Sequence, residues 1–585
     1  MKNKIVIEKI ISVMLAFIVY FCLCYNNDMN SYSMASWFVF AMLIIAFLKT
    51  NLFAKEHLKE RILLTILFSF ITVYGNVLYM SAYHNVDIIK EVLRLGTIKN
   101  ILLYTPIIYI ILTNIYLYLY NLNIKESKKI NISNKLIFII SLIFIFICWL
   151  PYLLNFFPGT LSPDSISEFT MISNGLKSVS DHHPIAHVLF VALFYNIGNL
   201  FTNNINIAIS FATIAQMLIM SAILAYTIVF LKARGVNKWI LLGLLCIYAF
   251  LPVNGYYSIV MWKDVLFAGS LVLFTMETIK IIEKDRKGKL AKKDYVPFVL
   301  SSLFCIFFRN NAIYMYIIFT VCGFFLLLHN KKSITITSVI LILSFFIIKG
   351  PVFSLLNVTK SASSKYIAIP LQQVARIVYR DAKLTKEEEK LINDLIPIET
   401  IKKDYNPSVV DSIKFNKDYN REVFDNNKLE YFKLWVRLMI KHPIISIESY
   451  FLSTIGYYYP GVESWATADN VYENEYGIKQ TILLPEKVSN LIYNFNSRKF
   501  PILAMEWSVG LYFWVLLIAV CITVSKHGIK YIYPFIPSIG IWITMMIASP
   551  VWGEFRYVYC VFLSMPLLLL FPYYINGKKD KYEKK

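Results

Sequence analysis

Apolar stretches long enough to cross a membrane recur along this sequence and limit what it can fold into. A helix needs ~17–25 predominantly apolar residues to span a bilayer, and about fourteen stretches approach that length. Of the 585 residues, 57% are hydrophobic and only 16% are charged, which excludes an ordinary soluble domain. We therefore predict an all-α polytopic membrane protein. The predicted spans lie near residues 5–25, 34–48, 62–82, 101–120, 136–154, 205–231, 238–257, 262–282, 296–309, 312–328, 334–350, 507–525, 530–548 and 555–573.

The basic residues are concentrated in short loops between these spans. The formal net charge is +21, but the Lys and Arg residues cluster in short loops between apolar runs, so we expect no nucleic-acid partner. Cytoplasmic loops are enriched in Lys and Arg, which also attract anionic lipids. With the spans in this order, all basic segments and both termini fall on one side. Since no organelle-targeting pattern is present, we expect a multi-pass protein of a bacterial plasma membrane, with cytoplasmic termini and membrane lipids as partners. The basic segments are 1–4, 49–61, 124–135, 232–238, 283–294, 329–332, 526–530 and 578–585.

One further apolar stretch, residues 185–201, does not fit this topology. If it crossed the membrane, every later basic loop would lie outside the cell. We therefore expect it to lie at the outer interface, or to enter the membrane and return. Residues 155–204 then form a first outer loop.

A long polar interval predicts a second region outside the membrane. Residues 384–395 read as an amphipathic helix that begins with a capping box of Thr385 and Glu388. Residues 429–459 either lie on the membrane or form a hairpin of two spans, since both arrangements preserve the topology. The predicted parts are an N-terminal four-helix membrane segment (1–134), a transmembrane core (135–350), a mainly helical extracellular and interfacial domain (351–506), and C-terminal helices with a basic tail (507–585).

Polar and ionisable residues gather at the outer ends of several predicted spans. Such residues are costly near hydrocarbon and often mark functional sites. Because they share one face of the membrane, we predict that they form one site. The candidates are Asp164, Asp181, His182, His183, Lys263, Asp264, Arg309, Asn311, Glu554, Arg556 and Tyr557. Three polar residues of the second outer region are further candidates for substrate contact: Gln372, Gln373 and Arg376.

These motifs resemble those of the GT-C glycosyltransferases. The nearest pattern is that of the protein O-mannosyltransferases and the aminoarabinose transferases of bacterial lipid A. There, the first outer loop carries the catalytic acid and a His-Pro-Pro motif, and a late helix often begins Glu-x-Arg-Tyr. This chain has Asp164, Asp181-His182-His183-Pro184 and Glu554-Phe555-Arg556-Tyr557 at the matching places. It is also similar to an uncharacterised group of Gram-positive membrane proteins that share the Pro-Gly-Thr-x-Ser-x-Asp and Asp-His-His-Pro elements.

The resemblance implies a GT-C-like core of helices over residues 135–573, and a sugar transfer outside the cytoplasm. The donor would be a polyprenyl-phosphate-linked sugar, and the acceptor a cell-envelope glycan, a lipid or a protein. A carboxylate takes the proton of the acceptor hydroxyl in such a reaction, and cations stabilise the departing phosphate. Asp164 is then the base, and Lys263, Arg309 and Arg556 face the phosphate. The resemblance assigns Asp181, His182 and His183 to catalysis and Asp264, Asn311, Glu554 and Tyr557 to substrate binding.

Two residues depart from the family pattern. Ser165 replaces the usual second acidic residue, which puts metal binding in doubt, and Ile185 replaces the second proline. His183 and His187 are spaced like a helical metal pair, but a third strong ligand is not evident in the sequence. We therefore assign no metal site and no certain cofactor, and leave a divalent cation open.

Simpler roles are open for the same residues. Asp164 can cap a helix, the cations can extend to lipid headgroups, and Glu554 can pair with an arginine. The whole protein can alternatively be a transporter or flippase, or a polymerase, of lipid-linked saccharides. A transporter is expected to show internal repeats and broken helices, and neither is visible in the sequence.

Overall fold

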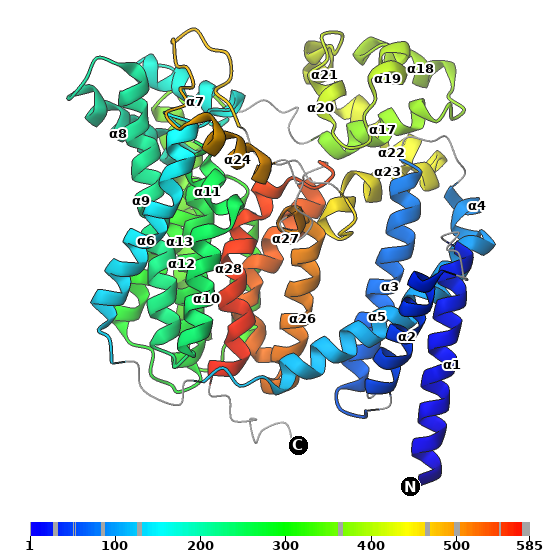
Figure 1. The fold of residues 1–585 in the computed structure, drawn as a ribbon. Helices are drawn as coiled ribbons and strands as arrows, with labels where there is room; N and C mark the ends of the chain where they lie inside the picture. The colour runs from blue at the N-terminus through cyan, green and yellow to red at the C-terminus, as the bar shows by residue number, and fades with distance from the viewer. Residues whose placement is uncertain are drawn as a thin grey trace.

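Helices make up nearly all the regular structure of the protein in its computed structural model (Figure 1). Within the described residues, β structure is limited to isolated bridges. The all-α class predicted from the sequence is therefore confirmed. The structure describes residues 2–26, 33–50, 52, 54–82, 88–125, 131–360, 367–462, 469–496, 504–548 and 551–575.

The long apolar helices make this a polytopic membrane protein. In the described part of the chain, nine helices are long and apolar enough to cross a membrane, and a bent pair supplies a tenth. The nine are α3 (Leu58–Met80), α5 (Leu95–Asn121), α6 (Asn134–Asn155), α9 (Ile205–Lys232), α12 (Lys263–Asp285), α15 with its continuation (Lys331–Leu355), α26 (Val509–His527), η6 with α27 (Ile529–Ala548) and α28 (Phe555–Tyr574). The other predicted spans also contain helices: α1 (Lys2–Asn26), α2 (Met34–Lys49), α10 (Lys238–Phe250) with α11 (Pro252–Ile259), α13 (Tyr295–Phe308) and α14 (Ala312–Leu326).

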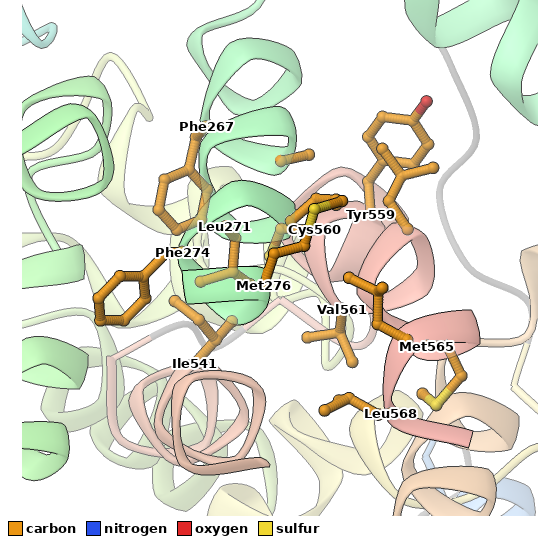
Figure 2. Close-up of a cluster of buried hydrophobic side chains, with 14 of the residues drawn as sticks. Phe267, Leu271, Phe274, Met276, Ile541, Tyr559, Cys560, Val561, Met565 and Leu568 are labelled. Atoms are coloured by element: carbon orange, nitrogen blue, oxygen red, sulfur yellow. The ribbon is translucent and has the colours of Figure 1, made fainter. Parts of the chain in front are cut away.

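Helix α12 lies at the centre of the bundle. Its most apolar stretch is 89% buried, and it packs against α9, α13 and α28. Figure 2 shows Leu271 and Met276 of α12 beside Cys560 and Val561 of α28. Within a bilayer such contacts stabilise the bundle through close packing rather than through exclusion of water. The packing holds α12 and α28 in a fixed relation to each other.

The bent pair α10–α11 is a feature that the sequence analysis missed. Residues 238–257 were predicted as one continuous span, but the two helices meet at an angle of 51° at Leu251–Pro252. Proline at the first position of α11 cannot donate a hydrogen bond to the preceding turn. All eight residues of α11 are buried, and the segment after it leads directly to Lys263.

Helix α8 (Ile185–Asn199) is the apolar stretch that we expected not to span. It has 15 residues, fewer than the candidate spans, and packs mainly against α9. It lies beside α7 (Pro163–Ser173) at one end of the bundle (Figure 1). Both its length and its position agree with an interfacial helix.

A layer of short helices covers part of the same end of the bundle (Figure 1). In α18 (Lys386–Leu395) the predicted capping box is confirmed, because Thr385 and Glu388 each accept a hydrogen bond from the other's backbone N–H. With 14 and 11 residues, α22 (Lys428–Lys441) and α23 (Pro443–Ser453) are too short to span, which favours the surface arrangement. The remaining short helices are α4 (Ile88–Leu93), α16 (Phe353–Leu355), α17 (Ala368–Tyr379), α19 (Ile398–Asp404), α20 (Asp411–Lys414), α21 (Arg421–Asn426) and α24 (Glu486–Asn496).

The polar residues of α17 are structural, so the prediction that they reach a substrate is wrong. Gln372 and Gln373 are buried and donate to backbone carbonyls within the same layer. Arg376 is fully buried, forms a 2.6 Å ion pair with Glu448 of α23, and donates to the Ala82 carbonyl after α3. These bonds dock the layer onto the N-terminal helices.

Candidate functional site

A glycine turn fixes the entry to α7. Gly159 has φ +122°, a backbone conformation that side chains rarely adopt. A Cβ atom there would lie 2.6 Å from Thr213 Oγ1 and 2.9 Å from the Ile259 carbonyl oxygen. Only glycine fits this contact, which explains the Pro-Gly-Thr element of the sequence.

The residues after Gly159 pair with two segments that are distant in the sequence. Thr160 pairs with Val260, just before α12, and Leu161 pairs with Val471, in the segment that precedes α24. The Ser162 hydroxyl caps α7 and also accepts a 2.7 Å hydrogen bond from Trp262 Nε1. These bonds fix the first turn of α7 against the start of α12. Asp164 is the second residue of that turn.

Asp164 contacts two cations that come from distant parts of the chain. Its Oδ2 atom lies 3.3 Å from Lys263 Nζ and 3.2 Å from Arg556 Nη1. Lys263 is the first residue of α12 and Arg556 the second residue of α28, so the N-termini of three helices meet here. Helix N-termini carry partial positive charge and add to the attraction for anions. The predicted clustering of these three residues is therefore observed.

The protonation state of Asp164 follows from these neighbours. Burial raises the pKa of its carboxyl, but Lys263, Arg556 and His183 together bring that pKa well below its usual range. The Asp164 side chain is 34% exposed, and those of Lys263 and Arg556 are 19% and 17% exposed. The carboxylate is thus ionised, and all three groups are open to an incoming molecule.

The Glu-x-Arg-Tyr element orients the Arg556 guanidinium. Glu554 forms an ion pair with Arg556 Nε, and Arg556 Nη2 donates a 2.9 Å hydrogen bond to the Tyr557 hydroxyl. The guanidinium also lies 5.1 Å from the centre of the Trp262 ring. Burial raises the pKa of Glu554, and the opposing charge of Arg556 does not reverse this. The alternative in which Glu554 pairs with an arginine is therefore observed.

Arg309 and Asp264 lie deeper than the three open groups. They form a 3.1 Å ion pair, and their side chains are only 7% and 1% exposed. Arg309 also donates to the Tyr557 carbonyl at 3.4 Å, behind Arg556. Asn311 is exposed and directly precedes α14, without a side-chain capping bond. These residues support the site from behind or flank it, rather than lining its opening.

A buried carboxylate, Glu168, holds two histidines. It lies four residues after Asp164, and its two oxygens contact the Nδ1 atoms of His183 and His187, the former at 3.3 Å. His183 Nδ1 is also 3.3 Å from Lys263 Nζ. His182 is exposed, and its ring lies edge-on to that of His183 at 4.4 Å. His183 therefore belongs to the same cluster as Asp164.

Asp181 has a different partner. It forms an ion pair with Lys349, in the continuation of α15, and its backbone carbonyl accepts a 3.2 Å hydrogen bond from Asn310. Lys349 Nζ also donates to Asn310 Oδ1 at 2.8 Å. These bonds fix the segment that carries the histidines.

A pocket of about 610 Å³ opens beside this cluster. It lies between α7 and the 180–183 segment, and its walls are partly polar. The lining residues are Pro163, Ile166, Ser167, Thr170, Met171, Ser180, His182 and His183.

Asp411, in the layer of short helices, is a further acidic residue at the site. It begins α20, and residues just before it pair with residues 551–552, which precede Glu554. Asp411 is exposed, the surrounding protein raises the pKa of its carboxyl, the charges of Lys414 and Arg556 oppose that rise, and Asp164 adds to it. Asp411 is therefore a second carboxylate within electrostatic reach of Asp164 and Arg556.

Sequence reasoning missed Glu168, Lys349 and Asp411. Glu168 had a usable signal, because a spacing of four residues puts it on the same face of α7 as Asp164. Lys349 stood at the outer end of a predicted span, where a lysine is unusual. Asp411 carried no such signal, since it comes from a layer with many charged residues.

Taken together, the fold and the charged cluster define a polytopic α-helical membrane protein with a polar site at one end of its bundle. The chain belongs to a family of unknown function (DUF6020), whose model matches residues 177–585. The matched range includes the histidines, Lys263 and Arg556, and it begins after Asp164 and Glu168. No curated protein and no solved structure matches the chain.

Proposed function

We propose that the protein is a glycosyltransferase with a GT-C-like core that acts at the outer face of a bacterial plasma membrane. It moves a sugar from a polyprenyl-phosphate donor to an extracytoplasmic glycan, lipid or protein. The observation that carries this proposal is the contact of Asp164 with both Lys263 and Arg556, at the meeting point of three helix N-termini. That arrangement suits an anionic leaving group next to a carboxylate base.

The chemistry assigns separate tasks to these groups. The acceptor hydroxyl oxygen attacks the anomeric carbon, and the bond from that carbon to the phosphate oxygen breaks. Asp164 takes the hydroxyl proton, while Lys263 and Arg556 stabilise the charge that develops on the polyprenyl phosphate. Arginine suits this task because its guanidinium can bind two phosphate oxygens at once.

The low pKa of Asp164 in the free protein fits a base that is activated by its substrate. A weakly basic carboxylate is a poor general base, because the best pKa lies near the working pH. A bound donor phosphate shares Lys263 and Arg556 with Asp164, which weakens their effect on the carboxylate. The pKa of Asp164 then rises when the donor is present, and the base becomes stronger only in the productive complex.

The pocket beside α7 suits the acceptor. It reaches the Asp164 cluster through His182 and His183, and Ser167 and Thr170 supply hydroxyl groups for hydrogen bonds to a sugar. Asp411 approaches from the outer layer and is suited to orient the acceptor. Donor and acceptor would then meet from opposite sides of Asp164.

The test is sugar transfer by the full-length protein in proteoliposomes that contain polyprenyl-phosphate sugars with a radiolabelled sugar. Asp164→Asn keeps the size of the side chain, and we expect it to lower turnover by about 100-fold or more. Ser173→Ala, an exposed change at the last position of the same helix and outside the pocket lining, is the matched control and retains most activity. Lys263→Met and Arg556→Met are expected to weaken donor binding. Wild-type turnover by a folded Asp164→Asn variant rejects the proposal.

A second candidate, translocation of lipid-linked saccharides, is favoured by the bent pair α10–α11. Broken helices are typical of transporters, and Glu506 meets the start of α11 through a 3.4 Å hydrogen bond from the Val253 N–H. The same proteoliposomes, with the donor in one leaflet, separate the two functions. Transbilayer movement that survives Asp164→Asn, without any sugar transfer by the wild type, identifies a translocator.

A further inference from the structure

Three potential metal ligands converge at the mouth of the pocket. One carboxylate oxygen of Asp164 and one ring nitrogen each of His182 and His183 all lie within 4.8 Å of one another. Ligands of a tetrahedral zinc ion, at ~2.0–2.1 Å from the metal, are about 3.3 Å apart. A side-chain movement of about 1.5 Å therefore closes the cluster around an ion. His182 is exposed and has room for that movement.

The buried carboxylate of Glu168 fixes the ring of His183. Histidines that ligate metals usually bind a carboxylate through their other ring nitrogen, which fixes the ring orientation. Glu168 is 3% exposed and contacts His183 through Nδ1, at 3.3 Å. The same Nδ1 atom lies 3.3 Å from Lys263 Nζ, so both contacts engage Nδ1, and we assign Nε2 as the ligating atom. Asp164 then binds the metal, and Glu168, four residues later on α7, orients His183.

The neighbouring cations leave room for a metal. The ion pairs that Asp164 makes with Lys263 and Arg556 both use Oδ2, so Oδ1 can bind an ion. The ion pairs of Glu168 with described residues are with histidines only. The two carboxylates nearest the histidines are Asp164 and Glu168, and both belong to α7.

The donor set identifies the class of metal. Mg²⁺ and Ca²⁺ prefer oxygen ligands, whereas two imidazoles and one carboxylate suit zinc and its neighbours among the divalent transition metals. Ser165, where the GT-C pattern has a second acidic residue, donates a 2.7 Å hydrogen bond to the Met261 carbonyl and is already engaged. An oxygen-only site is therefore not built here.

We propose that Asp164, His182 and His183 bind one divalent transition-metal ion of the zinc class, with Glu168 orienting His183. The proposal uses Asp164, the base of the proposed function, but its test measures metal content rather than sugar transfer, so the failure of one is distinguishable from the failure of the other. A tetrahedral ion with these three ligands takes a water molecule as its fourth.

The test is metal content. The full-length protein is purified in detergent, stripped with a chelator, reloaded with Zn²⁺ or Mg²⁺, freed of excess ion and analysed by atomic emission. The expected result is about one zinc ion per chain and no retained magnesium. Cobalt loaded in place of zinc reports the coordination through its visible absorption.

Variants assign the ligands. His182→Ala is the main variant, because this side chain is exposed and its loss leaves the fold intact; it is expected to lose the zinc and the cobalt spectrum. Glu168→Gln is expected to weaken affinity by about 10–100-fold. His329→Ala is the control, because this exposed residue, in the loop between α14 and α15, bonds Asp285 only through its backbone N–H. Equal zinc content in the wild type and His182→Ala overturns the proposal, as does retention of magnesium in preference to zinc.

Discussion

A buried carboxyl group outside the charged cluster makes the stability of this protein depend on pH. Glu506 lies in a short turn before α26, is 6% exposed, and accepts its hydrogen bond from the Val253 N–H at 3.4 Å. Burial raises its pKa from 4.5 to about 8, against the weaker opposing effect of that hydrogen bond. Between these values the folded protein holds a proton that the unfolded chain has released. The stabilisation is therefore complete below pH 4.5 and is lost as the pH rises towards 8.

The size of the effect follows from proton linkage. In this range one extra bound proton changes the free energy of unfolding by about 1.4 kcal/mol per pH unit. From about pH 5.5 to about pH 7.5, the wild type should lose on the order of 2.7 kcal/mol through this group. Glu506→Gln keeps the shape of the side chain but cannot ionise. Its stability relative to the wild type should rise by that amount over the same interval.

The assay is unfolding of the detergent-purified full-length chain by an SDS titration at three pH values in this interval. The quantity compared is the difference in unfolding free energy between the wild type and Glu506→Gln at each pH. Glu422→Gln, at an exposed position in α21, is the control and should show no such trend. A difference that stays constant from pH 5.5 to 7.5 refutes the reasoning, because Glu506 would then have the same charge in both states.

Two further changes test the glycine turn before α7 and the ion pair that docks the layer of short helices. Gly159→Ala should lower the unfolding free energy by about 2 kcal/mol or more and reduce activity, because it adds a clash to a strained backbone. Gly175→Ala, which has φ +65° but no atom within 4 Å of the new Cβ, should cost about 1 kcal/mol; equal losses in the two variants would contradict this account. Arg376→Met should cost roughly 3 kcal/mol by leaving Glu448 buried without its main partner. Adding Glu448→Gln to Arg376→Met should recover much of that loss in the same SDS titration, and an undiminished loss would argue against the ion pair.

The helices were predictable because their signals are local. The length of each apolar run sets where a helix can cross the membrane, and each predicted span contains a helix in the structure. The capping box of Thr385 and Glu388 was equally readable, since it involves two residues three positions apart. The prediction that residues 185–201 lie at the interface came from the basic loops later in the sequence, and the 15-residue length of α8 agrees with it.

The partners within the site were not predictable, because they join distant residues. Asp181 was grouped with Asp164 because both lie in the first outer loop, but its partner is Lys349, 168 residues later. Asn310, rather than the predicted Asn311, bonds to that pair, and the turn geometry before α14 decides which of the two faces inward. Arg376 was a candidate for substrate contact, whereas an ion pair and two backbone carbonyls hold it inside the fold.

The long separation between the partners of Asp164 sets an order in which the site is assembled during synthesis. Lys263 follows Asp164 after 99 residues, and Arg556 follows only after 392. At a translation rate of about 5–20 residues per second, the ribosome needs about 20–80 s to reach the arginine. During that time the carboxylate has only its lysine partner. A chain that stops before its last helix leaves Asp164 with Lys263 alone, so the site is complete only once α28 has been made.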